Sequence, residues 1–524
     1  MGREVSRRQL LGQAGFAAAG LAGLGGLGGL AGCTSHKTAA TKTLPSAKVV
    51  DSSRLVDGYQ SFVTRPDLQP PVVDIVRSAP PTRAGYYFLN APLSGPGRGG
   101  GLITDLDGGL VFMQPDTPTA HVIDFNTQIL NGKSVLTWFE GVETHGWGQG
   151  VAVVANRAYQ RKHVIHAHTG PHDEVKLHVD HHEFNITPEG HALISAYRTY
   201  SNIDLRPVGG PASGVMVAGV CQEIDIATGK LIFEWDSWQN GVPLEEGNQP
   251  FDYNGEKFGI ADNPYDYFHI NSIAPTADGH LLISSRNTWT IYKVNRTNGK
   301  IIWRMNGKKS DFTMGPGSNF YWQHHLRPHP DGIFTVFDNG AAPPKEKQSR
   351  ALILAVDEQK MHVTLRHHYS HPDQVLLAQA MGSTQLMPDG NVVVGWGTNY
   401  YFSEFSQDGT LVAAATMTKH NPSYRVFSHN FYGHPSDPPD VVARHRPGGA
   451  TIYASWNGAT ELDSWTVMSG RSRSSVSAVA TAKKHGFETA IEVPSAGPYF
   501  AVRAHDASGR QLAQSASVRI SPHH

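Results

Sequence analysis

Histidine, asparagine and arginine recur in the middle of the chain where predicted strands begin or end. The residues are His269, Asn271, Arg286, His324 and His325. A neutral imidazole can act as a nucleophile or an acid near pH 7, and a planar guanidinium can bind an oxyanion. Polar groups on the rim of a β scaffold commonly form binding and catalytic sites. The pattern indicates such a site, although each residue taken alone fits a packed or exposed loop equally well.

A second cluster contains side chains that ligate metals: His178, Asp180, His181, His182 and Glu183. The segment is expected to be a strand, in which His178, Asp180 and His182 share one face and His181 takes the other. Its spacing matches no closed zinc pattern. A histidine-lined pocket, ordinary packing and a metal site all remain open for this cluster.

Short apolar runs separated by tight turns must position these residues. Runs at 281–283, 290–294 and 301–304 are split by Asn-Gly and follow an Asp-Gly, which is typical of antiparallel hairpins. An acidic residue followed by glycine also precedes apolar runs near residues 108, 190, 332 and 390. Strand units that repeat in this way predict an all-β fold, a β-propeller of about six blades over residues 51–435. The segment 198–262 fits either one blade with insertions or parts of two.

The periodicity changes after Pro435. A proline-rich linker at 436–440 precedes short strands at close spacing, with Trp456 early and Tyr499 late. This pattern predicts a small fibronectin-III-like β-sandwich over residues 436–524. Nothing in it resembles a catalytic site, so a spacer or interaction module is expected.

The N-terminus carries targeting signals. Arg7 and Arg8 precede an uncharged run rich in Ala, Gly and Leu that ends in Leu30-Ala31-Gly32-Cys33. This predicts a twin-arginine lipoprotein signal over residues 1–33, with lipidation at Cys33, rather than an unprocessed membrane anchor. Residues 34–50 are expected to be a flexible tether. The protein would then be exported and anchored by lipid to the outer face of the cytoplasmic membrane.

Composition excludes some partners. The net charge is −1 and only 17% of the residues are charged, so no basic field exists to hold nucleic acid. No other stretch is long and apolar enough to span a membrane, so membrane contact is expected only through the lipid anchor. Cys221 is the one cysteine besides Cys33, and it is interpreted as a small buried apolar residue rather than a nucleophile.

Three motifs together resemble the bacterial arylsulfate sulfotransferases, in particular the branch common in actinobacteria and fungi. The motifs are HHEFNITPEGHALIS, DYFHINSIAPTADGHLLISSRNTWTIYKVNRTNGKIIWRMNGKKSDF and WQHHLRPHPDGIFTVFDNG. The resemblance implies a six-bladed propeller that moves a sulfuryl group from an aryl sulfate to a phenol. It implies neither a nucleotide sulfate donor nor a metal or other cofactor. It also implies that a histidine of the site becomes sulfated transiently.

Site roles follow from the same resemblance. His324 matches the nucleophile, while His269, Asn271 and Arg286 match residues that hold sulfate oxygens. His182 matches the histidine that exchanges a proton with the phenol oxygen. Substrate contacts are expected from the remaining neighbours His325, Trp322 and His181. An aromatic slot formed by Tyr267, Trp289, Tyr321 and Trp322 is one interpretation, and core packing is the other.

Two features depart from the family pattern. His325 stands where many relatives carry an acidic residue, so it could alter the nucleophile or exchange roles with it. The extra sandwich follows the propeller, whereas it comes first in the periplasmic enzymes. Two other functions remain as alternatives: a non-catalytic, lipid-anchored binding propeller, and a metal-dependent hydrolase or lyase on the same fold. The sequence sets no oligomeric state.

Overall fold

The structure is a computed structural model that describes residues 44–81, 83–91, 97–171, 173–253, 256–418, 421–494 and 497–521. The predicted signal, Cys33 and most of the predicted tether lie outside the described residues. Regular structure in the described part is almost entirely β-strand, joined by the short 3-10 helices η1 (Arg206–Val208), η2 (Leu244–Glu246) and η3 (Pro330–Gly332). None of its helices is both long and apolar enough to cross a membrane.

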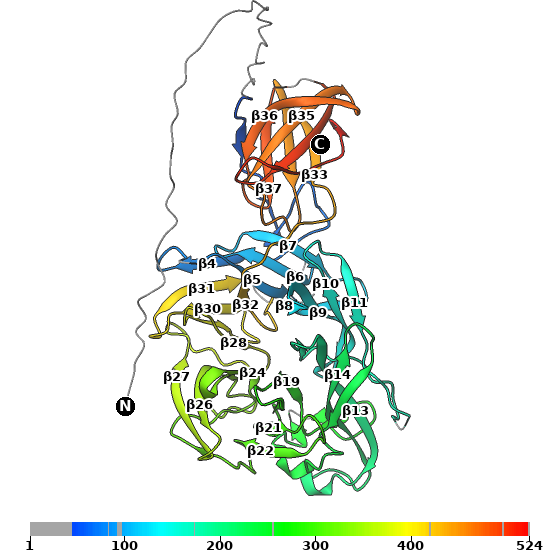
Figure 1. Cartoon of the computed structure of the whole chain (residues 1–524), viewed down its shortest axis with the longest axis vertical. Coiled ribbons are helices and arrows are strands. Elements are labelled where there is room, and N and C mark those ends of the chain that lie inside the picture. Colours follow the sequence, from blue (N-terminus) through cyan, green and yellow to red (C-terminus); the bar gives the residue numbers. More distant parts are fainter. Residues whose placement is uncertain are drawn as a thin grey trace, which may run out of the picture. The chain divides into compact units, whose positions relative to one another are not determined.

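Six sheets of four or five strands follow one another along the chain (Figure 1). The first contains β5 (Tyr86–Ala91), β6 (Gly100–Asp105), β7 (Leu110–Pro115) and β32 (Phe427–His429). The second contains β8 (His121–Leu130), β9 (Lys133–Thr144), β10 (Trp147–Ala155) and β11 (Arg161–Ile165). The third contains β12 (Phe184–Ile186), β13 (His191–Ile203), β14 (Gly214–Asp225), β15 (Leu231–Asp236) and β18 (Tyr265–Asp266).

The remaining three sheets have the same plan. The fourth contains β19 (Ile270–Pro275), β20 (Leu281–Ser285), β21 (Thr290–Val294) and β22 (Ile301–Met305). The fifth contains β23 (Thr313–Met314), β24 (His324–His329), β25 (Ile333–Asp338), β26 (Arg350–Asp357) and β27 (His362–Tyr369). The sixth contains β4 (Val73–Arg77), β28 (Ser383–Leu386), β29 (Val392–Gly395), β30 (Tyr401–Phe405) and β31 (Leu411–Met417).

Two exchanges between the chain ends close the ring of sheets. The late strand β32 pairs with β5 in the first sheet, and the early strand β4 pairs with β31 in the sixth. Each sheet also contacts the next, from β5 against β8 to β28 against β32. A closed ring of antiparallel sheets is a β-propeller, as the repeated turns predicted.

The hairpins form because glycine occupies the turn positions that need a left-handed backbone. Gly279 has a φ of 81° two positions before β20 begins, and Gly299 has a φ of 71° two positions before β22 begins. A residue with a Cβ is strained at such angles, so these glycines fix where each strand starts. The strand predicted at 290–294 is confirmed with those bounds.

The segment 198–262 contributes to a single sheet. β13, β14 and β15 pair in sequence, and the chain from Ser237 to His269 is an insertion. The insertion contains η2, the short hairpin β16 (Asp252–Tyr253) and β17 (Glu256–Lys257), and β18, which pairs in parallel with β14. The insertion therefore ends at His269, one of the predicted site residues.

The C-terminal region forms two facing sheets. One contains β1 (Lys48–Val50), β33 (Asp440–Arg446), β34 (Gly449–Ser455) and β37 (Glu488–Val493). The other contains β35 (Ser464–Ser472), β36 (Ser475–Lys483), β38 (Tyr499–His505), β39 (Gln511–Gln514) and β40 (Val518–Arg519). Ile452, Trp465, Ile491 and Val502 from both sheets share one buried core. Two sheets that share a core form a β-sandwich.

The N-terminal boundary differs from the predicted one. Residues 34–50 were expected to be a tether, but Lys48–Val50 form β1 and pair with β37 of the sandwich. Val49 packs against the sandwich core, and β37 would otherwise be an edge strand with unpaired backbone groups. A small hairpin, β2 (Leu55–Val56) and β3 (Tyr59–Gln60), follows before β4 begins.

Candidate active site

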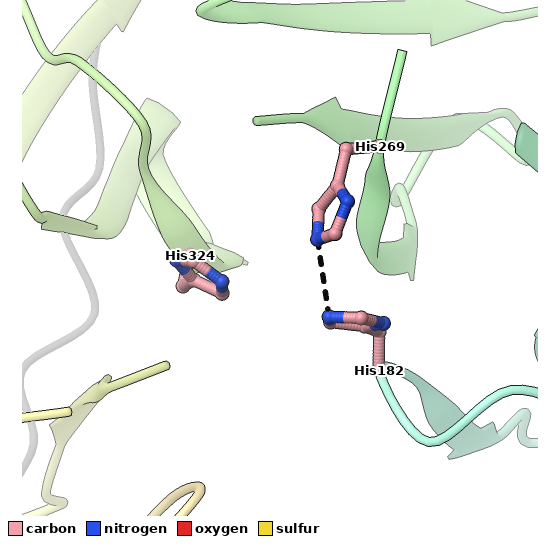
Figure 2. A group of neighbouring side chains, drawn as sticks. All are labelled: His182, His269 and His324. Atoms are coloured by element: carbon pink, nitrogen blue, oxygen red, sulfur yellow. Dashed lines mark hydrogen bonds between the residues drawn. The ribbon is translucent and has the colours of Figure 1, made fainter. Parts of the chain in front are cut away.

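Three histidines from neighbouring sheets face one another (Figure 2). His182 lies in the turn before β12, His269 directly precedes β19, and His324 is the first residue of β24. The Nε2 atoms of His182 and His269 are 3.2 Å apart. One ring nitrogen from each of the three histidines lies within 4.8 Å of the others. His182 and His324 are buried, and the His269 side chain is 12% exposed.

A polar acceptor fixes the Nδ1 atom of each ring. The carboxylate of Asp180 lies 2.8 Å from Nδ1 of His182, and that of Asp266 lies 2.5 Å from Nδ1 of His269. A carboxylate accepts, so each of these rings carries a proton on Nδ1 and directs Nε2 toward its neighbour. Two facing Nε2 atoms at 3.2 Å then need a proton between them.

His324 is held by an amide instead of a carboxylate. Asn339 Oδ1 lies 2.7 Å from Nδ1 of His324, while the Asn339 amide nitrogen donates to the carbonyl groups of Ala378 and Met381. The oxygen of Asn339 is therefore the atom that faces the ring, and it accepts the Nδ1 proton. The lone pair of His324 is then on Nε2, where the backbone N–H of Met381 donates to it over 3.3 Å.

Burial and charge keep these groups in distinct protonation states. Burial, together with the nearby Arg286 guanidinium, lowers the pKa of His324 well below its ordinary value, although the bond to Asn339 opposes this. Burial also lowers the pKa of His182, against the effect of Asp180. Burial alone would raise the pKa of Asp180, but His182 and His181 and the N–H of Gly148 hold it well below its usual range. His324 is thus neutral and Asp180 ionised near pH 7.

Arg286 supplies a fixed positive charge beside the histidines. It follows β20, and its guanidinium donates to Asn287 Oδ1 and to the carbonyl of Gln379. The same guanidinium lies 4.9 Å from the ring centre of Trp322, a cation–π contact. These contacts hold the charge at the wall of the cavity that also contains His324.

Two cavities meet at this site. The histidine cavity has a volume of about 380 Å³ and is lined by the three histidines, Arg286 and Asn287 among others. The apolar cavity, about 530 Å³, is lined by Val122, Ile123, Val142, Pro422 and Tyr424 among others. The two share four lining residues: Glu143, His181, Met381 and Thr398. An anionic group beside the histidines can therefore carry an apolar group that extends into the second cavity.

His181 lies at this junction. Its ring stacks on that of His182 with 4.1 Å between centroids, and burial lowers its pKa to about 4. His181 lines both cavities, and its contact with a substrate stays a prediction. The expected strand at 178–183 is wrong, however, because His181 and His182 form a turn. The turn lets consecutive rings stack, which the alternation of a strand would prevent.

Two residues predicted to contact the substrate, Asn271 and Trp322, line neither of these cavities. Asn271 is buried outside both cavities, and its amide donates to the carbonyl of Gln323 over 2.6 Å. Trp322 is fully buried, bonds the carbonyl of Pro343 and supports Arg286. Asn271 thus positions the chain before His324 rather than reaching sulfate oxygens. Of the predicted aromatic slot, neither Tyr267 nor Trp289 lines either cavity.

His325 faces a third space, the arginine cavity, of about 260 Å³. His325 has a φ of 51°, and the pairing of β24 with β25 shifts between His324 and Arg327. This bulge turns the two neighbouring imidazoles toward different cavities. His325 shares the arginine cavity with Arg327 and Arg425, so it cannot replace His324 without a change of backbone.

The residues that orient the histidines were not predicted. Asp180 was considered only as a metal ligand, and Asp266, Asn339 and Met381 were given no role. Asp266 stands three positions before His269, and Asn339 ends the run Phe337-Asp338-Asn339-Gly340. Polar residues at fixed places inside the quoted motifs were the available signal. Cys221 is a free, fully buried thiol whose pKa burial raises, which confirms its predicted character.

The fold and the site define a β-propeller whose histidine centre is suited to transfer of an anionic group. A family model described as arylsulfotransferase (ASST) matches residues 126–418, which is more than half of the chain. The chain belongs to the arylsulfotransferase family. No curated protein matches it.

Solved structures show distant similarity only. A Bacteroides caccae protein of unknown function is 10% identical, with 66% of this chain and 99% of that chain covered and a TM-score of 0.39. Virginiamycin B lyase from Staphylococcus aureus is 10% identical, with 66% and 98% covered and a TM-score of 0.30. The β-propeller domain of Cps50 (Swd1) from Myceliophteria thermophila is 10% identical, with 65% and 97% covered and a TM-score of 0.30.

Proposed function

We propose that the protein transfers a sulfuryl group from an aryl sulfate to a phenol through a sulfated His324. The observation that carries the proposal is the state of His324. Its Nδ1–H donates to Asn339. The neutral ring therefore directs its Nε2 lone pair toward a cavity that Arg286 also lines. An imidazole in this state is a nucleophile that needs no base.

In the first step, Nε2 of His324 attacks the sulfur atom of the aryl sulfate. The N–S bond forms, the bond between sulfur and the aryl oxygen breaks, and the aryl oxygen leaves with the electron pair. The proton held between His182 and His269 passes to that oxygen, so a neutral phenol departs. The carboxylates of Asp180 and Asp266 keep both rings oriented for this transfer.

Negative charge on the sulfuryl oxygens must be stabilised while the sulfuryl group moves to His324. Sulfuryl transfer resembles phosphoryl transfer, in which donors already in place at the equatorial oxygens lower the barrier. Arg286 offers a fixed guanidinium, and the N–H of Met381 lies where the sulfuryl group would arrive. As the lone pair of His324 is taken up by sulfur, this N–H becomes free to bind an oxygen.

The second step reverses the first with another phenol. The His182–His269 pair takes the proton of the incoming hydroxyl, the phenol oxygen attacks sulfur, and the N–S bond breaks to restore His324. Asn339 suits this reversal because a neutral amide stabilises a positively charged ring less than a carboxylate would. The N–S bond is therefore kept weak enough to break.

The aryl groups of donor and acceptor bind in turn in the apolar cavity. Its walls combine aliphatic side chains with the ring of Tyr424, and it joins the histidine cavity at His181. A planar ring buries apolar area there while its oxygen reaches the histidines.

Steady-state transfer tests this proposal. With 4-nitrophenyl sulfate as donor, phenol as acceptor, excess EDTA and no nucleotide, we expect release of 4-nitrophenol to rise with phenol concentration and phenyl sulfate to form in equal amount. Parallel lines in double-reciprocal plots are expected, because a covalent intermediate gives ping-pong kinetics. Absence of turnover over a panel of aryl sulfates would contradict the proposal and favour a binding propeller.

We also propose export and lipid anchoring through Cys33, on the strength of the Arg7-Arg8 pair and the run ending in Leu-Ala-Gly-Cys. The protein should partition with membranes, and Cys33→Ala should abolish incorporation of labelled palmitate. Unchanged labelling in this variant would overturn the assignment.

A further inference from the structure

Each of the three site histidines is prepared as a metal ligand. A histidine that binds a metal through one ring nitrogen almost always donates its other N–H to a carboxylate or carbonyl group, which fixes the ring. His182, His269 and His324 have such partners in Asp180, Asp266 and Asn339 at 2.8, 2.5 and 2.7 Å. Nε2 of His182 and Nε2 of His269 face each other across the shared space shown in Figure 2, and Nε2 of His324 accepts only the long hydrogen bond from the N–H of Met381, at 3.3 Å.

The spacing of the rings also suits a metal. Two imidazole nitrogens bound to one tetrahedral Zn²⁺ are about 3.3 Å apart, because each Zn–N bond is about 2.0–2.1 Å long. The Nε2 atoms of His182 and His269 are 3.2 Å apart. The ligand atoms of all three residues lie within 4.8 Å, so His324 needs to approach by at most about 1.5 Å to complete a three-nitrogen site.

The surroundings favour a divalent transition metal over a harder cation. Three imidazoles suit Zn²⁺, Cu²⁺ or Ni²⁺, whereas Mg²⁺ and Ca²⁺ prefer oxygen ligands. Asp180 and Asp266 place two carboxylates directly behind the ligands. The adjoining histidine cavity leaves room for water in a fourth position.

We propose that His182, His269 and His324 bind one Zn²⁺ or similar divalent ion, which competes with aryl sulfates. The ion lies between Nε2 of His182 and Nε2 of His269 and takes the lone pair of His324 from the backbone N–H of Met381. Binding should therefore block the nucleophile. Metal binding itself does not depend on the proposed function, whereas the inhibition rests on it.

Calorimetry with ZnCl₂ on chelator-stripped protein tests the binding. We expect one tight site per chain and a raised Tm. His269→Asn should weaken this site by about 100-fold or more, and Asp266→Asn by about 10- to 100-fold although every ligand remains. The double variant His367→Asn/His368→Asn removes a pair of histidines on β27, outside the site, and should bind as the parent does.

Three further measurements separate the outcomes. Co²⁺ should give the visible absorption of a four-coordinate nitrogen site in the parent and lose it in His269→Asn, which must keep the far-UV spectrum of the parent. Zn²⁺ should slow 4-nitrophenol release in competition with the donor, and EDTA should restore it. Absence of a one-to-one site, or equal affinity in parent and His269→Asn, would overturn the proposal. Sulfation of His324 in EDTA, measured separately, reports whether the sulfotransferase proposal stands.

Discussion

His324 and His325 are neighbours in the chain, yet they belong to two different kinds of cavity. In the histidine cavity, the Nε2 atoms of His182 and His269 face each other. The carboxylates of Asp180 and Asp266 lie on the far side of these rings, at Nδ1. In the arginine cavity the charges are paired directly. Arg425 lies 3.0 Å from Asp124 and 3.5 Å from Glu183, and Arg327 bonds both oxygens of Glu183 at 2.9 Å.

In the proposed mechanism, the histidine cavity is the reactive site and the arginine cavity supports it. Arg425 also donates to the backbone carbonyl groups of His182 and Asn271. Its ion pairs therefore hold the chain that carries the histidines. Buried charges that are paired and hydrogen-bonded fix a conformation, whereas a neutral imidazole whose lone pair accepts only a long hydrogen bond can form a bond to a substrate.

The largest effect should distinguish the two adjacent imidazoles. We expect His324→Ala to lower the rate of aryl sulfate consumption by roughly 10⁴-fold or more, because it removes the nucleophile. His325→Ala should leave the chemical step nearly unchanged, since this ring faces the arginine cavity. Stopped-flow release of 4-nitrophenol measures both. An equal loss in the two variants would erase the proposed distinction.

Removal of the proton-transfer pair should have the next largest effect. His182→Ala should lower the rate by about 10²- to 10⁴-fold, which is the usual contribution of a general acid or base. The loss should grow with the pKa of the leaving phenol, because a poor leaving group depends more on protonation. A series of substituted phenyl sulfates measures this slope. A loss independent of the leaving group would mean that His182 only supports the structure.

A substitution in the arginine cavity should lower the free energy of unfolding. Arg425→Met leaves Asp124 and Glu183 buried without their shared partner, and breaking such a pair commonly costs about 3–5 kcal/mol. Urea unfolding should show this loss, whereas His324→Ala, which leaves one buried amide oxygen without its donor, should cost less, about 1–3 kcal/mol. If Arg425→Met unfolds like the parent but does not react, Arg425 belongs to the chemistry instead.

A change of pH profile should follow from Asn339→Asp. In the parent, the depressed pKa of His324 keeps the ring neutral through the mildly acidic range, so its protonation should not limit the reaction there. A carboxylate at Nδ1 favours the charged ring and raises its pKa, so activity should be lost as pH falls through the new value. Single-turnover rates of the parent and of Asn339→Asp between pH 5 and pH 8 would show this loss of activity. Overlapping profiles would place the nucleophile elsewhere.

The smallest expected effect concerns Glu143, which lines both cavities of the site and is exposed. We expect Glu143→Gln to lower kcat/KM for an amine-bearing phenol such as tyramine by a few-fold, since a partly exposed charge pair is worth about 1 kcal/mol or less. Phenol itself should be unaffected. Asp331→Asn, a matched change at an exposed turn, serves as control, and equal behaviour of the two variants would remove Glu143 from specificity.

The sequence predicted the scaffold better than the direction of its side chains. Turn glycines and alternation located β20, β21 and β22, because both signals are local. His324 and His269 were identified through long motifs, and both line the histidine cavity. The roles of Asp266 and Asn339 could not be derived, since each depends on contacts between specific atoms.

Two residues whose surroundings differ from the prediction show why the remaining side-chain contacts could not be predicted. Trp322 seemed suited to hold a phenyl ring, but its burial against Arg286 follows from packing between sheets. His325 seemed equivalent to His324 until the bulge in β24 separated them. β1 likewise joins β37, which lies more than 400 residues away in the chain. Such pairings depend on tertiary structure, which local patterns do not encode.

The most direct test is the intact mass of the protein after brief mixing with 4-nitrophenyl sulfate in EDTA and without acceptor. We expect one sulfuryl adduct on the parent and on His325→Ala, none on His324→Ala, and loss of the adduct when phenol is added. An adduct that persists in His324→Ala would contradict the assignment of the nucleophile. No adduct on any variant, with no release of 4-nitrophenol, would contradict the sulfotransferase account itself.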